Sequence, residues 1–259
     1  MHTHYDKAEL LPLRHLTPNL TVGIEASSRQ TQRLLRYVSV FGLNILGGLY
    51  VSGTENLDQL GECSLVVAPN HSSYLDGPAV GAAVLTLVEH SIISEATTSV
   101  LVMRNLIDKA GPFEEFARVL YGSAGFLPVN IDDNAPLGAT RELIRHMTKV
   151  RKDQKLGISH VTIAFPEGQR NDQLGDLKNG VITIATKTGS LIVPTGISGP
   201  SDIMPKGTKL PRRRSPTVIH FGTPVDPSAD SFDDPLAELR AGITAATNRA
   251  NKVRLGLQS

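Results

Sequence analysis

The chain has 259 residues, 40% of them hydrophobic and 20% charged, which is the ordinary composition of a globular protein long enough for one large domain or two small ones. Its 26 lysines and arginines nearly balance 25 aspartates and glutamates, so overall charge does not indicate a nucleic-acid-binding protein. The single cysteine, Cys63, excludes an internal disulfide and a zinc site built from several cysteines.

The segment from residue 33 to residue 51 is rich in apolar residues, and their spacing predicts a helix with a wide apolar face. Its uncharged part, residues 37–51, would rise about 22 Å as a helix, which is less than the roughly 30 Å hydrocarbon core of a bilayer. We therefore expect no membrane span. The helix either packs on the domain or lies in the membrane interface, and the pattern alone favours neither. This divides the chain into an N-terminal segment (1–50) and a domain (51–259).

Beyond residue 51 the apolar patterns of strands and helices alternate. Helices are predicted at 77–88, 105–121, 137–150, 178–187 and from 234 onward, and strands at 64–68, 100–103, 126–129, 161–165, 191–193 and 217–221. Pro194 predicts that the strand before it ends there or lies at an edge of the sheet. The alternation predicts a single α/β domain whose mixed, largely parallel sheet is flanked by helices.

Two of the predicted strands lead directly into segments with reactive side chains. His71 and Asp76 follow the first strand, and Glu167 follows the strand at 161–165. Because parallel strands end at one edge of a sheet, we expect His71 and Glu167 to open onto one site. A histidine paired with a carboxylate can remove a proton from a hydroxyl group. Taken alone, however, the spacing is more typical of a surface loop in which Asp76 caps a helix.

Several other kinds of site are not indicated by the sequence. It contains no G-x-S-x-G nucleophile elbow, no phosphate-binding P-loop and no G-x-G-x-x-G dinucleotide motif. The histidines lack the close spacing of metal ligands, so no metal site is expected. Arg170, three residues after Glu167, could bind a phosphate or carboxylate through two parallel hydrogen bonds, although a loop salt bridge is the better explanation when this segment is taken alone.

Two segments together resemble the glycerolipid acyltransferase family. Residues 70–76 (NHSSYLD) resemble its NHxxxxD block, and residues 165–170 (FPEGQR) are similar to its FPEGTR block, in the same order. Shorter family blocks match on both sides, at 51–57, 178–180, 192–197, 205–207 and 221–225. The chain is identified as a member of this family over residues 51–225.

The resemblance implies an O-acyltransferase of the 1-acylglycerol-3-phosphate type, active in phospholipid biosynthesis. It would move a fatty acyl group from a thioester, either acyl-CoA or acyl carrier protein, to a hydroxyl of a lysophospholipid or related glycerolipid. It implies His71 as general base and Asp76 as the residue that orients and charges the imidazole. Glu167, Gly168 and Arg170 would shape the acceptor pocket, and Lys178 would add positive charge. No cofactor is implied beyond the thioester co-substrate.

One block departs from the family pattern and puts the acceptor in doubt. Where the family commonly reads G-x-x-P-V-D-R, this chain has Asn130 in place of the acid and Ile131 in place of the arginine. A neutral aliphatic side chain cannot bind a phosphate dianion. Either Arg170, Lys178 or the basic run at 206–214 compensates, or the acceptor is not a simple phosphate monoester.

The resemblance also changes how the helix at 33–51 is interpreted. Since both substrates carry long acyl chains, it now favours a helix that docks on a membrane surface, in a peripheral protein at the cytoplasmic face. The basic runs at 145–155 and 206–214 would favour an anionic leaflet by about 1 kcal/mol per well-placed residue. Two alternatives stay open. One is a thioester hydrolase, with water as acceptor, and the other is a non-catalytic lipid-binding protein, which the retention of His71 and Asp76 disfavours.

Overall fold

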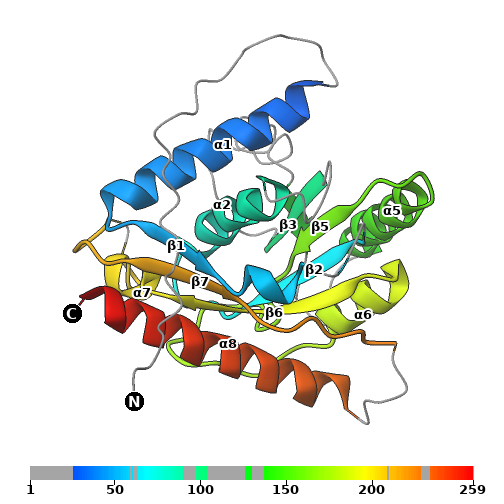
Figure 1. The fold of residues 1–259 in the computed structure, drawn as a ribbon. Helices are drawn as coiled ribbons and strands as arrows, with labels where there is room; N and C mark the ends of the chain where they lie inside the picture. Colours follow the sequence, from blue (N-terminus) through cyan, green and yellow to red (C-terminus); the bar gives the residue numbers. More distant parts are fainter. Residues whose placement is uncertain are drawn as a thin grey trace.

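The computed structural model of the protein describes residues 26–58, 60, 63–89, 97–103, 126–129, 137–208, 210–228 and 234–258. In this part of the chain a seven-stranded sheet lies between two layers of helices (Figure 1). The elements in chain order are α1 (Ala26–Ile45), β1 (Leu49–Ser52), the 3-10 helix η1 (Thr54–Asn56), β2 (Leu65–Pro69), α2 (Asp76–Glu89), β3 (Thr97–Met103), β4 (Phe126–Val129), α5 (Leu137–Gln154), β5 (His160–Ile163), α6 (Gly180–Thr188), β6 (Leu191–Ser198), α7 (Pro200–Ile203), β7 (Thr217–Phe221) and α8 (Pro235–Gln258). The predicted helix at 105–121 lies outside the described residues.

The sheet has the strand order β1-β7-β6-β2-β5-β3-β4. Every neighbouring pair is parallel except β6 and β7, which are antiparallel. The predicted α/β fold with a largely parallel sheet is therefore confirmed. The order also makes β2 and β5 direct parallel neighbours, so the loops that follow them leave the sheet at the same edge.

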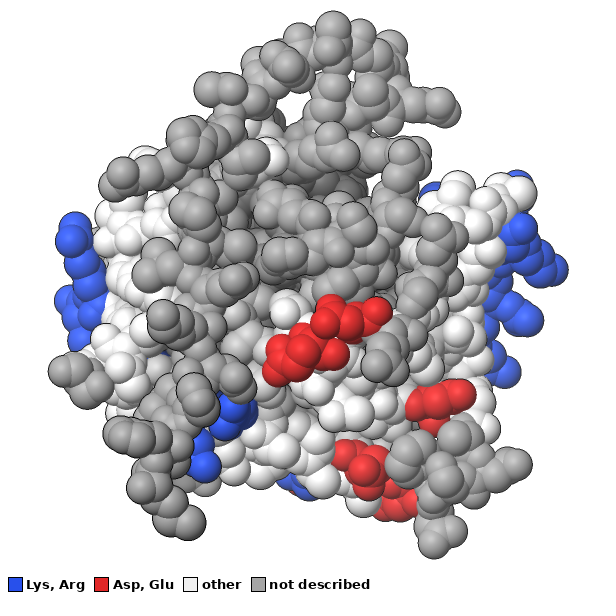
Figure 2. Space-filling model, viewed as in Figure 1, with Lys and Arg blue, Asp and Glu red and all other residues white. Residues whose placement is uncertain are grey.

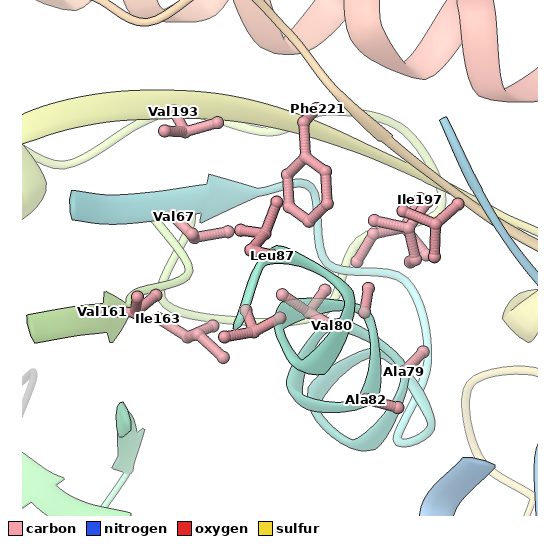
Figure 3. Close-up of a cluster of buried hydrophobic side chains, with 14 of the residues drawn as sticks. Val67, Ala79, Val80, Ala82, Leu87, Val161, Ile163, Val193, Ile197 and Phe221 are labelled. Atoms are coloured by element: carbon pink, nitrogen blue, oxygen red, sulfur yellow. The ribbon is translucent and has the colours of Figure 1, made fainter. Parts of the chain in front are cut away.

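The core forms on both faces of the sheet because neighbouring residues of each strand point to opposite sides. On one face, Val67 and Val193 belong to a cluster with α1 and α2. Figure 3 shows residues of this cluster from β2, β5, β6 and β7 around helix α2. On the other face, Val66 and Ile192 belong to a second cluster with α5, α6 and α8. The central strands β2 and β6 are thus buried on both sides, which explains their continuous apolar sequence.

The first helix begins and ends earlier in the chain than its apolar pattern predicts. The prediction continued the helix to residue 51, which is wrong, since α1 ends at Ile45 and β1 pairs with β7. The chain reverses at Gly47 and Gly48, whose φ angles of 135° and 98° are unfavourable for other residues. A Cβ at Gly47 would lie 2.4 Å from the main chain of Ser215. The apolar run continues past the turn because β1 is itself half-buried in the sheet.

Strand β6 runs through Pro194 and lies between β2 and β7, so the prediction of an edge or a strand end is also wrong. The N–H of Ile192, two residues earlier, points to the β7 side and donates to the carbonyl of Val225 at 2.8 Å. Regular pairing with β7 begins at Thr195, opposite Phe221. The nitrogen of Pro194 therefore falls in the gap between these pairs, where the sheet needs no donor.

Candidate active site

The loop between β2 and α2 carries the first two predicted site residues. The first residue of this loop, Asn70, is bonded to strand β6. Its side chain accepts a hydrogen bond from the N–H of Ile197 at 2.7 Å and donates one to the carbonyl of Ile197 at 3.2 Å. These bonds continue the β2–β6 pairing one residue past Pro69. The position of His71, the next residue, is therefore fixed relative to the sheet, and His71 is the first residue of the loop that does not pair with β6.

His71 and Asp76 are in direct contact. Nδ1 of His71 lies 3.0 Å from Oδ2 of Asp76, whose side chain is fully buried. The same oxygen accepts the main-chain N–H groups of Ser72 at 2.6 Å and Ser73 at 2.7 Å. These bonds fold the loop back onto the start of α2, which explains how two residues five positions apart can meet. On a continuous helix they would point in different directions.

The His71 ring presents its second nitrogen away from Asp76. Its side chain is 21% exposed, and no hydrogen bond to Nε2 occurs among the described residues. The ring packs against Phe165, with 4.1 Å between the ring centroids. An imidazole held at Nδ1 by a carboxylate has its tautomer fixed, with the proton on Nδ1 and the lone pair on Nε2. This arrangement can accept a proton from a hydroxyl group placed next to Nε2.

The loop after β5 brings Arg170 to the same place. A tight turn at Gly168, with φ of 67° and a hydrogen bond of its N–H to the carbonyl of Phe165 at 3.1 Å, directs the chain toward the β2–α2 loop. The Arg170 guanidinium lies 3.4 Å above the centroid of the Tyr74 ring. Its Nη1 is buried and has no hydrogen-bond partner in the described part of the chain. A buried guanidinium nitrogen without a partner can donate to an anionic ligand.

The other two predicted site residues differ sharply in burial. Glu167 is only 2% exposed, and both of its carboxylate oxygens are bound by other residues of the protein. Lys178 has an exposed side chain, and its main-chain N–H donates to the carbonyl of Pro166 at 2.9 Å. The structure thus brings His71, Asp76, Glu167 and Arg170 together, while Lys178 lies at the surface beside the same loop.

Sequence reasoning missed two residues that contact this constellation. Asn171 donates to the carbonyl of His71 through its main-chain N–H, and Gly175 donates to Glu167. Their position just after the FPEGQR segment was a weak signal, because nothing in the spacing indicated a contact with His71. Asn130 and Ile131, which raised the question of the acceptor, lie outside the described residues. Within the described ranges, no group of three or more metal-ligating side chains could hold a metal ion.

Comparisons with known proteins indicate the family and the fold of the chain. A family model described as Acyltransferase matches residues 48–198. The chloroplastic 1-acyl-sn-glycerol-3-phosphate acyltransferase BAT2 of Brassica napus is 37% identical over 81 residues, which span 29% of this chain but only 24% of that protein. The crystal structure of the 1-acyl-sn-glycerophosphate (LPA) acyltransferase PlsC from Thermotoga maritima has a TM-score of 0.60 and 20% sequence identity, and the match covers 90% of this chain and 84% of that one. At this identity the structural likeness establishes the fold alone.

Proposed function

Because the chain belongs to the acyltransferase family, we propose that it transfers a fatty acyl group from an acyl thioester to a hydroxyl of a lysophospholipid or related glycerolipid. The donor is acyl-CoA or acyl carrier protein. The observation that carries the proposal is the contact of 3.0 Å between His71 Nδ1 and buried Asp76, which leaves Nε2 without a partner among the described residues. The similarity to proteins named as 1-acyl-sn-glycerol-3-phosphate acyltransferases supports a glycerolipid acceptor.

In the proposed mechanism the acceptor attacks the thioester directly. His71 Nε2 takes the hydroxyl proton while the oxygen forms a bond to the thioester carbonyl carbon. The carbon–sulfur bond then breaks, and the proton passes from His71 to the leaving thiolate. Asp76 stabilises the imidazolium between these steps through its bond to Nδ1. No acyl-enzyme forms, so the mechanism needs no serine or cysteine nucleophile.

Arg170 is our candidate for binding an anionic group of the acceptor. It is tied to the catalytic loop by stacking on Tyr74, and none of the described residues bonds its buried Nη1. Lysophospholipid acceptors carry a phosphate, whose oxygens would supply the missing acceptor atoms. Lys178 would add positive charge from the surface. Whether these groups replace the arginine expected at Ile131 depends on the acceptor.

The decisive test uses purified protein, acyl-CoA and a panel of lysophospholipids with different head groups. We expect free thiol to be released only when an acceptor is present, together with the diacyl product detected by mass spectrometry. Thiol release without an acceptor would identify a thioester hydrolase. No turnover with any acceptor or either donor would contradict an enzymatic role and leave a lipid-binding protein.

We propose that α1 docks the protein on the cytoplasmic face of a membrane. Leu34, Val38, Phe41 and Ile45 recur along one side of α1, and each is between 49% and 68% exposed. The opposite side buries residues such as Leu43 in the core beside α2. No helix in the described part of the chain is both long and apolar enough to cross a membrane. An exposed apolar stripe on a packed helix supports binding in the plane of the interface.

Basic residues adjoin the end of α1. The carbonyl of Leu46 accepts a hydrogen bond from Ser215, which directly follows three exposed arginines, 212 to 214. Figure 2 shows Lys and Arg side chains at two sides of the molecule, over α5 and at the connection between α7 and β7. The second group lies next to α1 in the fold, so the apolar stripe and the arginines could contact one anionic surface.

Substituting Phe41→Asp should weaken binding to vesicles of phosphatidylcholine and phosphatidylglycerol by about tenfold or more. The reason is that burying a phenylalanine side chain contributes about 1.5–3 kcal/mol, and an aspartate would also be repelled by anionic lipid. Co-sedimentation measures the effect. Leu255→Asp is the matched control, because Leu255 is 60% exposed on α8, on the other side of the sheet, and should not change binding. Equal binding by the Phe41→Asp variant would contradict the proposal.

A further inference from the structure

The carboxylate of Glu167 is fully engaged inside the protein. It follows β5 in the turn that carries Arg170 and is 2% exposed. Oε1 accepts the main-chain N–H of His71 at 2.8 Å. Oε2 accepts the side-chain amide of Asn171 at 2.7 Å and the main-chain N–H of Gly175 at 2.8 Å. Both oxygens are thus directed at groups of the protein, and the buried side chain presents neither of them at the surface.

The main chain of His71 is held on both sides by this one loop. Its N–H is bound by Glu167, and its carbonyl accepts the main-chain N–H of Asn171 at 2.8 Å. Just before the loops, the N–H of Ala164 donates to the carbonyl of Val67 at 3.0 Å and keeps the two strands in register. The side chain of His71 is oriented separately by Asp76. Ring orientation and backbone position therefore depend on two different carboxylates.

Only a carboxylate satisfies the three groups around position 167. All three are donors, so a glutamine would turn its own NH₂ group toward one of them and lose a hydrogen bond. The space is also full, since a Cβ at Gly175 would lie 2.5 Å from Nδ2 of Asn171 and 3.2 Å from Oε2 of Glu167. At Gly175 the loop after β5 is also held by Arg240 of α8, whose guanidinium donates to the carbonyl of Gly175 at 2.8 Å.

We propose that Glu167 is a positioning residue that holds the backbone of His71 in place for proton transfer and does not bind the acceptor. This differs from the acceptor-pocket role expected from the family resemblance. The inference rests on the proposed function, because it assigns a role within acyl transfer. A base displaced by about 1 Å loses roughly 10²-fold in rate, since proton transfer depends on the approach of the reacting atoms. Substrate binding, by contrast, should be little affected.

The test is the Glu167→Gln variant with acyl-CoA and the best acceptor from the panel. We expect kcat to fall about 10- to 100-fold, with KM for both substrates within about twofold of the wild type. Gly175→Ala should show the same selective loss of kcat, and the double variant should lose less than the sum of the two, because both changes disturb one set of bonds. Asp172→Asn removes an exposed carboxylate from the same loop and should behave as wild type.

Two outcomes would overturn the inference. One is a rise in acceptor KM with kcat unchanged in Glu167→Gln, which would indicate acceptor binding. The other is strictly additive losses in the double variant. Thermal unfolding followed by circular dichroism shows whether each variant folds. If Glu167→Gln does not fold, the single variants Glu167→Asp and Gly175→Ala are used in its place.

A second measurement does not need turnover. The Nδ1 proton of His71, bonded to Asp76, should give a downfield NMR signal that is missing in His71→Ala. We expect this signal to shift or broaden in Glu167→Gln but not in Asp172→Asn. An unchanged signal in Glu167→Gln would overturn the inference even if the wild type acylated every acceptor. Absence of turnover in the wild type would instead count against the proposed function alone.

Discussion

His71→Ala should lower kcat for acyl transfer by about 10³-fold while the protein remains folded. General bases contribute roughly 10²–10⁴-fold, and no other described residue is placed to replace Nε2. Folding should be kept because the contacts of position 71 with Glu167 and Asn171 are made by its main chain, which alanine retains. Asp76 would also keep its bonds to the main chain of the loop.

The measurement is the rate of free thiol release at saturating acyl-CoA and acceptor. His220→Gln serves as the control. This half-buried histidine on β7 is bonded through Nδ1 to Ser52 at 3.0 Å, and burial lowers its pKa, but it has no part in the proposed site. It should keep wild-type kcat. Full activity of His71→Ala would contradict the assignment of His71 as general base.

Asp76→Asn should lower kcat by about 10²-fold or more and should destabilise the fold less than Asp76→Ala. Oδ2 of Asp76 accepts the hydrogen bonds of this carboxylate, and Oδ1 is buried without a partner among the described residues. An asparagine can put its oxygen in the place of Oδ2 and keep the bonds from Ser72 and Ser73, while its NH₂ takes the place of Oδ1 and costs some stability as a buried donor without an acceptor. The bonds to the loop are kept but the negative charge is lost, and with it the stabilisation of the imidazolium formed when His71 accepts the proton.

Comparison with Asp76→Ala separates the effect of the lost charge on kcat from the effect of the lost hydrogen bonds on stability. The alanine variant leaves the N–H groups of Ser72 and Ser73 without an acceptor, so we expect it to lose about 1–3 kcal/mol of unfolding free energy as well as activity. Urea unfolding measures stability, and thiol release measures kcat. Wild-type kcat in Asp76→Asn would show that the charge is not used. Equal stability of the alanine and asparagine variants would show that Asp76 does not hold the loop.

Local patterns were sufficient for most of the fold. The strands at 126–129 and 217–221 were predicted with the bounds observed, and the described elements predicted from β2 onward follow the observed order, which also contains the short helix α7. Two errors, at α1 and at Pro194, arose where local sequence was ambiguous. An apolar run suits a buried strand as well as a helix, so α1 was extended through Gly47 into β1. A proline disfavours a central strand only where its nitrogen faces a partner, and the direction of Pro194 depends on the pairing of β6 with β7.

The sequence by itself determined the alternation of strands and helices, the membership of the glycerolipid acyltransferase family and the identity of the paired His71 and Asp76. These follow from periodicity and from short motifs, which are properties of neighbouring residues. Only the tertiary structure decided what surrounds that pair. It placed Arg170 on Tyr74 and Glu167 on the main chain of His71, 96 positions away. Contacts of this range depend on β2 and β5 being neighbours in the sheet, and no local spacing encodes that order of strands.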